Sequence, residues 1–206
     1  MTRQASWGRR CWQPLKRLVL QFMGPRMVWG FVRGDGVYLP NTRVSNHTSI
    51  FARERLDVAD HVFVGHFSVL DATWGLSIGE GCQIGFFTGV FTHSSHVAIR
   101  LYGRSYAQAQ SKHAYFEAPV QIGAYSFLGA HSVVLPGSVI GRGSLVSAQA
   151  VVKGVFPDFA ILAGNPARVV GDTRDLDGPY LRSHPELLTH YEAWAGPFVF
   201  PPTSER

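Results

Sequence analysis

The chain has 206 residues, the size of one ordinary domain with or without tails. Hydrophobic residues make up 46% of it and charged residues only 16%, which excludes a disordered chain and a bundle of membrane spans. The formal charge of +5 would suit nucleic-acid binding, but six of the nineteen basic residues lie in the first 26 positions and no basic stripe follows. We therefore expect no nucleic-acid partner. The 22 glycines and 12 prolines favour many short strands and tight corners over a helical bundle.

The first predicted element is an amphipathic helix over residues 12–23, within an N-terminal extension of residues 1–35. One of its faces carries the apolar residues Leu15, Leu18, Val19 and Phe22. We expect this helix to cover an end of the following domain; contact with an anionic membrane surface is the alternative. The chain start lacks the cleavage site of a signal peptide, and its two cysteines, Cys11 and Cys82, lack metal-ligand spacing. These features predict the cytoplasm, with peripheral contact to the inner face of the membrane left open.

A six-residue period is the strongest pattern in the chain. In the second half, aliphatic residues recur at steps of six, at Ile122, Leu128, Val134, Ile140, Val146 and Val152. An earlier array repeats the pattern with one slip of two residues, at Val58, Val64, Leu70, Ile78, Ile84 and Val90. The position after each aliphatic residue is mostly small, and for the first five residues of the second array the position four places on is Ser or Ala. Neither a helix of period 3.6 nor a plain alternating strand has this spacing.

A six-residue unit of this kind is one short strand and one corner, and three units form a coil that stacks about 4.8 Å above the previous one. We therefore predict an all-β solenoid, a triangular prism with the aliphatic residues inside. The small residues leave room beside them, and we expect the glycines to permit tight corners. Cys82 stands at a small position, so we interpret it as an interior filler and not as a nucleophile. An antiparallel sandwich would need the spacing to be accidental.

The period breaks between Val90 and Val120, and we expect an excursion loop over about residues 92–119. Loops this long inside compact folds are usually functional or disordered. The excursion carries three histidines, two arginines and several aromatic residues, which disfavour simple disorder. Its aromatic side chains also need another surface to cover them.

The solenoid domain is predicted to span residues 36–170, followed by a C-terminal tail of residues 171–206. Within the tail, Ser183 is an N-cap candidate with a proline two places on. We therefore predict a short helix from about 185 to 194.

The units IGEGCQ, IGFFTG, IGAYSF, LGAHSV and IGRGSL resemble the hexapeptide repeats of the left-handed parallel β-helix acyltransferases, of the sugar O-acetyltransferase type. The resemblance covers roughly residues 56–170. Residues 163–168, AGNPAR, match the A-G-x-P-A-[KR] element that closes the helix in this superfamily. The left hand of the coils is implied by this resemblance alone, because the general rule for parallel crossovers predicts a right hand.

The resemblance also implies the active-site residues. His93 in the THSSH segment matches the catalytic histidine, and His96 is the second choice. An imidazole suits the reaction, because a group with a pKa near 6.5 can take the proton of an alcohol at neutral pH. Ala130 matches a position whose backbone N–H would meet the developing oxyanion. His66 and Asp71 fall near positions that bind the acceptor sugar, with a structural role as the alternative for Asp71.

Acetyl-CoA is the acyl donor that the resemblance implies, bound in a groove between neighbouring chains of a homotrimer. The residues that match positions near the pantetheine arm and the CoA phosphates are Ala148, Lys153 and Arg168. A cation at such a position can meet a phosphate, although both charged residues would also suit a solvated surface. No metal is expected for this reaction.

The predicted function is an acetyl-CoA-dependent O-acetyltransferase that acts on a sugar hydroxyl of a polysaccharide or glycan precursor, without a covalent intermediate. An amino-sugar N-acetyltransferase is one alternative, and a non-catalytic scaffold is another. A third is a metalloprotein like the γ-type carbonic anhydrases, in which histidines of adjacent chains hold the metal. The histidines available for it are His61, His66, His93, His96 and His131. The long excursion and the AGNPAR ending favour the transferase.

Overall fold

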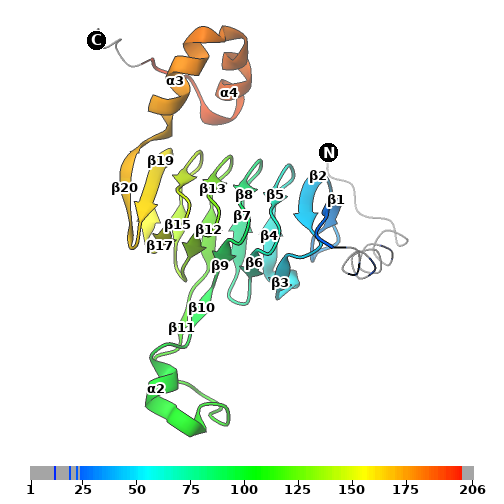
Figure 1. Ribbon diagram of the computed structural model, residues 1–206, viewed down its shortest axis with the longest axis vertical. Coiled ribbons are helices and arrows are strands. Elements are labelled where there is room, and N and C mark those ends of the chain that lie inside the picture. The colour runs from blue at the N-terminus through cyan, green and yellow to red at the C-terminus, as the bar shows by residue number, and fades with distance from the viewer. Residues whose placement is uncertain (1–11, 13–18, 20–21, 23, 201–206) are drawn as a thin grey trace.

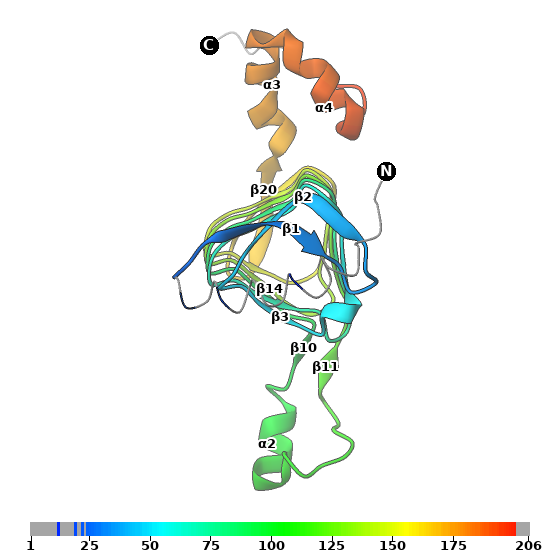
Figure 2. The same cartoon turned by 90° about the vertical axis from the view of Figure 1, so that its right-hand side faces the viewer.

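The structure is a computed structural model that describes residues 12, 19, 22 and 24–200. The helix predicted over residues 12–23 lies almost wholly outside the described residues. Three sheets enclose a triangular prism, which is seen end-on in Figure 2. The predicted all-β solenoid, with stacked parallel coils consistent with a left-handed β-helix, is confirmed.

Each sheet collects one strand from every coil (Figure 1). Sheet I contains β1 (Met27–Val32), β2 (Tyr38–Ser45), β5 (Phe63–Val64), β8 (Gln83–Ile84), β13 (Phe127–Leu128), β16 (Leu145–Val146), β19 (Ala160–Gly164) and β20 (Ala167–Asp172). Sheet II contains β3 (Ser49–Phe51), β6 (Val69–Asp71), β9 (Gly89–Val90), β14 (Val133–Val134) and β17 (Val151–Val152). Sheet III contains β4 (Leu56–Val58), β7 (Leu76–Ile78), β12 (Val120–Ile122), β15 (Val139–Ile140) and β18 (Val155–Phe156).

The interior is built from the residues that define the six-residue period. All twelve aliphatic residues of the two arrays are buried, none more than 3% exposed. The small residues beside them are buried as well, and Ser126 and Ser144 donate hydrogen bonds to the carbonyl of Gly141 at 3.0 and 2.7 Å. Cys82 is fully buried, and desolvation raises the pKa of its thiol to about 11. Its predicted role as an interior filler is confirmed.

The glycine after each aliphatic residue acts differently from the prediction. Gly123, Gly129 and Gly141 have no left-handed backbone. A Cβ on Gly129 would lie 2.4 Å from the backbone nitrogen of Ala148 in the next coil, so these glycines are required by the close approach of stacked coils. The left-handed corner residue stands two places later, as at His131 with φ 60°.

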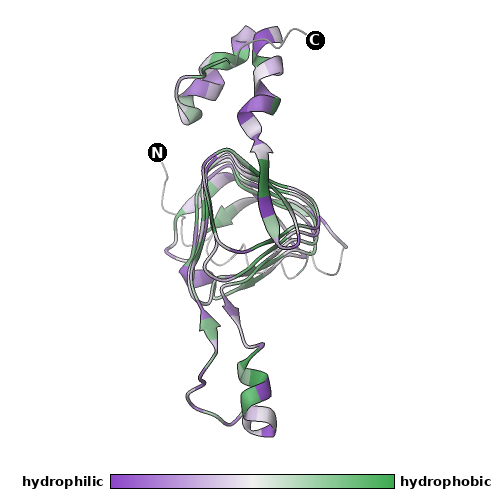
Figure 3. Ribbon diagram, turned by 90° about the vertical axis from the view of Figure 1, so that its left-hand side faces the viewer, coloured by the Kyte–Doolittle hydropathy of each residue, from purple (hydrophilic) through white to green (hydrophobic). Residues whose placement is uncertain are grey.

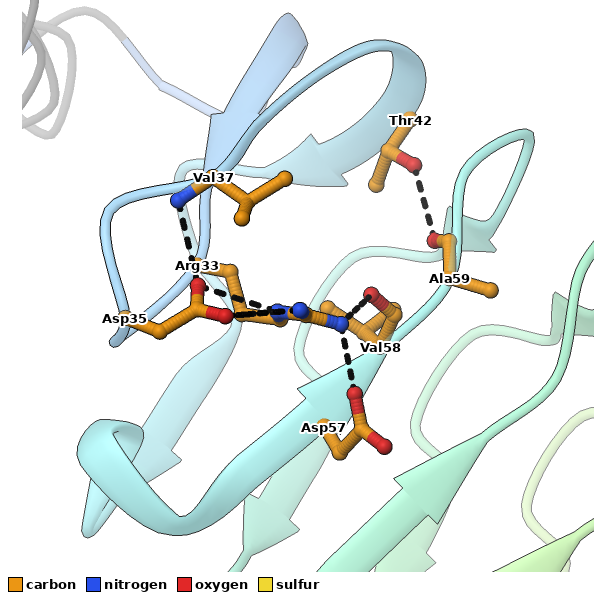
Figure 4. A network of polar contacts seen from close by, with 7 residues as sticks. All are labelled: Arg33, Asp35, Val37, Thr42, Asp57, Val58 and Ala59. Atoms are coloured by element: carbon orange, nitrogen blue, oxygen red, sulfur yellow. Dashed lines mark hydrogen bonds and ion pairs between the residues drawn. The ribbon is translucent and has the colours of Figure 1, made fainter. Parts of the chain in front are cut away.

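The chain enters the prism through an antiparallel hairpin. β1 pairs with β2, so it belongs to sheet I although the predicted boundary placed it in the N-terminal extension. Figure 4 shows how the turn of this hairpin is held to the first coil. Arg33 contacts Asp35 at 2.7 Å and Asp57 of β4 at 2.6 Å. Hydrogen bonds, first from Arg33 and then from the backbone of Val37, lower the pKa of Asp35 to about 2.

The excursion leaves the prism between β9 and β12 and stands away from its body (Figures 1 and 2). It begins and ends in the antiparallel pair β10 (His93–Ser94) and β11 (Phe116–Glu117). Between them lie the short helix α2 (Ala98–Tyr102) and a 3-10 turn, Gly103–Ser105. The predicted excursion is therefore ordered, and its base is a two-stranded ladder.

The C-terminal tail contains more helix than predicted. β19 and β20 form the closing hairpin around the AGNPAR segment. α3 (Thr173–Ser183) follows directly, capped by the Asp172 side chain, which accepts a hydrogen bond from the backbone N–H of Arg174 at 2.9 Å. The residues predicted to form one helix, about 185 to 194, form a 3-10 turn (Pro185–Leu187) followed by α4 (Leu188–Ala195). Ser183 is the last residue of α3 and not an N-cap. Figure 3 shows polar and apolar residues interspersed on these helices.

Candidate active site

The prism has three edges, and the candidate catalytic residue lies on the edge between sheets II and III. This edge, the II–III edge, consists of the segments that lead from each strand of sheet II to the next strand of sheet III. The segment that follows β9 is the excursion, and the segment that follows β6 comes directly after Asp71, the last residue of that strand. Because β6 and β9 pair in parallel, with Leu70 opposite Val90, Asp71 and the start of the excursion lie on neighbouring coils.

Two side chains predicted from sequence meet here. His93 Nδ1 lies 2.7 Å from Asp71 Oδ2. The His93 side chain is 36% exposed, whereas that of Asp71 is only 3% exposed. The imidazole therefore has one nitrogen against a buried carboxylate, on a ring that remains accessible from outside.

The Asp71 carboxylate is held by its own hydrogen bonds. Its Oδ1 accepts from the backbone N–H of Thr73 at 3.0 Å and from the Thr73 hydroxyl at 2.5 Å. Its Oδ2 accepts from the backbone N–H and the hydroxyl of Thr92 at 3.1 and 3.2 Å. Desolvation alone would raise the pKa of Asp71, but these hydrogen bonds and the neighbouring His93 together hold it below its ordinary value. Asp71 is thus an ionised carboxylate at neutral pH.

Both threonines were missed by the sequence analysis. Thr73 stands two residues after Asp71, the spacing at which an aspartate accepts a hydrogen bond from the backbone in a local turn. Thr92 directly precedes His93, and its hydroxyl also accepts from the backbone N–H of Trp74 at 3.0 Å. The D-x-T spacing was therefore available as a signal for a fixed carboxylate.

Aromatic rings of β11 and its approach pack against both candidate histidines. The ring of Tyr115 stacks on His93, with centroids 5.6 Å apart. Phe116 stacks on His96 with centroids 5.0 Å apart, and His96 Nδ1 lies 2.8 Å from the Ser94 hydroxyl. Among the described residues, the polar partner of the His96 ring is a hydroxyl, whereas that of His93 is a buried carboxylate.

The acceptor residues predicted from the resemblance are not gathered around His93. His66 lies on the edge between sheets I and II, where its Nδ1 is 2.7 Å from the Ser45 hydroxyl and its ring stacks on Phe86. Asp71 does lie at His93, but its carboxylate is already engaged by two threonines and the imidazole. The sugar-binding role of both residues stays a prediction.

The residues predicted for the oxyanion and the donor are spread over the prism. Lys153 follows β17 on the II–III edge and is exposed. Ala130 and Ala148 lie on the edge between sheets I and II, on neighbouring coils. Arg168 is exposed on β20, in sheet I. Within one chain the structure does not bring these residues to His93.

In the part of the chain that the structure describes, no three His, Cys, Asp or Glu side chains are grouped so that they could hold a metal ion. The same described part contains no helix long and apolar enough to cross a membrane.

A family model, bacterial transferase hexapeptide (six repeats), matches residues 114–154. The resemblance to hexapeptide-repeat transferases is confirmed. A probable acetyltransferase of Mycobacterium tuberculosis is 44% identical over 54 residues, which are 26% of this chain and 18% of that protein. A protein of Escherichia coli, provisionally named a lipopolysaccharide biosynthesis O-acetyl transferase, is 43% identical over 51 residues, 25% of this chain and 26% of that protein. The matches thus span about a quarter or less of these relatives.

Among solved structures, a hexapeptide-repeat acetyltransferase of Vibrio cholerae in complex with acetyl-CoA superposes with a TM-score of 0.53 and 25% identity. The superposition covers 61% of this chain and 64% of that one. It extends the likeness beyond the repeats that the family model matches.

Proposed function

We propose that this protein is an acetyl-CoA-dependent O-acetyltransferase that acts on a sugar hydroxyl, with His93 as its general base. The observation that carries the proposal is the 2.7 Å contact between His93 Nδ1 and the buried, ionised Asp71. The likeness to acetyltransferases, one of them in complex with acetyl-CoA, supports the donor and the reaction.

The roles of the two residues follow from their surroundings. With Nδ1 held against Asp71, the other ring nitrogen, Nε2, is left to take a proton from outside the prism. The acceptor oxygen attacks the thioester carbonyl carbon, its proton passes to Nε2, the carbon–sulfur bond breaks, and the proton then returns to the CoA thiolate. Asp71 fixes the tautomer of the ring and stabilises the imidazolium, so it acts as a positioning residue and stays ionised. No covalent enzyme intermediate is required.

The proposed donor residues are Lys153 and Arg168, whose positive charges suit the phosphates of CoA. We expect the change of both to alanine to weaken CoA binding about tenfold or more, while kcat at saturating acetyl-CoA changes little, because the lost contacts are the same in ground and transition states. Isothermal titration with CoA and steady-state kinetics measure the two effects.

Arg26→Ala is a matched control, since Arg26 is an exposed arginine at the opposite end of the prism. Equal CoA affinity in all three proteins would refute the assignment of Lys153 and Arg168. If the wild-type protein bound no CoA at millimolar concentration but contained stoichiometric zinc, the metalloprotein alternative would replace the transferase.

We also propose that the protein works as a homotrimer. The excursion stands off its own prism, and in α2 it leaves Ile99 47% and Leu101 66% exposed, so a neighbouring copy is needed to cover these side chains. A groove between copies would also bring Arg168 of sheet I in one copy near His93 and Lys153 on the II–III edge of another. Light scattering should give about three times the 22.7 kDa chain mass. A fully active monomer would refute the trimer.

The predicted cytoplasmic location and membrane contact through the N-terminal segment stay predictions. The second depends on residues outside the described part of the chain.

A further inference from the structure

The excursion carries a small, open polar pocket of its own, of ≈230 Å³, which we call the excursion cavity. Its walls are formed by Tyr106, Gln110, Lys112, Tyr115 and Glu117. Each of these side chains carries a hydrogen-bonding group, and the set combines an amide, an ammonium group, a carboxylate and two phenols. The larger groove of ≈850 Å³ beside α3 and α4 is different, because aromatic and aliphatic side chains form most of its lining.

The pocket is joined to the proposed base through two of its lining residues, Tyr115 and Glu117, and His93 is not itself in the lining. Tyr115 forms part of its wall and stacks on His93, with ring centroids 5.6 Å apart. Glu117, another wall residue, stands opposite His93 in the ladder between β10 and β11. A ligand in this pocket would therefore contact the two residues that neighbour the His93 imidazole.

The walls are held in place without a ligand. Lys112 Nζ donates a hydrogen bond to the carbonyl of Ala109 at 2.8 Å and lies 5.0 Å from the centre of the Tyr106 ring. The Tyr102 hydroxyl accepts a hydrogen bond from the backbone N–H of His113 at 2.8 Å and donates one to the carbonyl of Ser111 at 3.2 Å. These contacts fix the segment that carries Lys112, so that binding needs little ordering of the protein.

The chemistry of the walls selects a class of ligand. Each hydroxyl of a sugar both donates and accepts hydrogen bonds, so a sugar ring needs a mixture of donors and acceptors around it, as this cavity offers. Tyrosine rings add flat apolar surface for the C–H face of a pyranose. The pantetheine arm of CoA would use a mostly apolar lining, which these five residues do not provide.

We propose that this excursion cavity binds the pyranose unit that receives the acetyl group and presents one of its hydroxyls to His93. The inference rests on the proposed function, because it assigns the acceptor site of that same reaction. It places acceptor recognition in the excursion instead of at His66 and Asp71.

The test compares two glutamines of the same arm. Gln110 lines the cavity, whereas Gln108, two residues earlier, is exposed and does not. Acetyl transfer is measured with glucose, galactose, N-acetylglucosamine and maltose as acceptors, by release of the CoA thiol and by mass of the product. With the best of these sugars, Gln110→Ala should raise the acceptor KM about 3- to 10-fold and Lys112→Met about tenfold or more, from lost hydrogen bonds. Gln108→Ala should leave it unchanged, and the KM for acetyl-CoA should not move in any variant.

The outcomes separate this inference from the proposed function. If the wild-type protein acetylates none of these sugars, the sugar acceptor is refuted and this inference with it. If the wild-type protein is active but Gln110→Ala and Lys112→Met keep the wild-type acceptor KM, the cavity is not the acceptor site and the proposed function stands. Circular dichroism verifies that both variants are folded, and an acceptor KM that rises equally in Gln108→Ala would also overturn the assignment.

Discussion

We expect that changing His93 to alanine lowers kcat for acetyl transfer by about 10² to 10⁴, because the lost group is the proposed base for the acceptor's proton. The fold and the affinity for CoA should be nearly unchanged, since the His93 side chain is partly exposed and lies outside the aliphatic interior. Steady-state kinetics measure the loss, while calorimetry with CoA and a thermal melt verify that the rest of the protein is intact.

Two further variants make this result specific. His184→Ala serves as the matched control, because His184 is an exposed histidine paired with Glu186 in the C-terminal tail. His96→Ala should have a milder effect than His93→Ala, since the ring of His96 contacts the Ser94 hydroxyl whereas that of His93 contacts a buried carboxylate. Near-normal turnover in His93→Ala together with a large loss in His96→Ala would move the base to His96.

Asp71→Asn should lower kcat by about 10² or more while leaving the shape of the site nearly intact. An asparagine amide can present its N–H₂ group to His93 Nδ1, which favours the wrong tautomer, and it cannot stabilise the imidazolium by charge. The loss should be larger in kcat than in the KM of either substrate. Asp57→Asn is the control, since Asp57 pairs with Arg33 on the first coil, away from the excursion. Unchanged kcat and an unchanged pH profile in Asp71→Asn would refute the positioning role.

The same variant has a signature in stability. The pKa of Asp71 is lower in the folded protein than its ordinary value, so its carboxylate stabilises the fold above about pH 4, and this contribution is lost as the pH falls through the lowered value. In melts at successively lower pH, the wild-type protein should therefore lose stability more steeply in this acid range than Asp71→Asn. A variant that lost stability equally steeply would show that other carboxylates account for the acid sensitivity.

The period of the sequence was enough to predict the interior, because in a stacked coil each inward-facing position recurs at a fixed step. It could not give the reason for the glycines, since the contact that excludes a side chain at Gly129 comes from Ala148 on the next coil. α3 escaped prediction because Gly178 and Pro179 interrupt it, although Asp172 was present as a cap.

The partnership of Asp71 with His93 was also beyond the sequence pattern. The two residues are 22 positions apart, and a slip in the period stands between them, so their meeting depends on which strands pair. The register of β6 with β9 decides it. The resemblance supplied His93 and placed Asp71 near the sugar, with a structural role as the alternative, and the 2.7 Å contact of its buried carboxylate with His93 became visible only in the structure.

The ladder at the base of the excursion separates two parts of the protein that can change independently. β12 keeps its register with β7 and β15 on either side, as if the inserted residues were absent. The ends of the insertion are tied together by His93 opposite Glu117, and the entropy cost of closing the loop beyond them grows only slowly, by about 0.6 kcal/mol for each doubling of its length. Residues beyond that pair can therefore be exchanged, lengthened or shortened with little effect on prism stability. An exchange of the excursion beyond His93 and Glu117 could therefore change the acceptor, while His93, the proposed general base, stays in place.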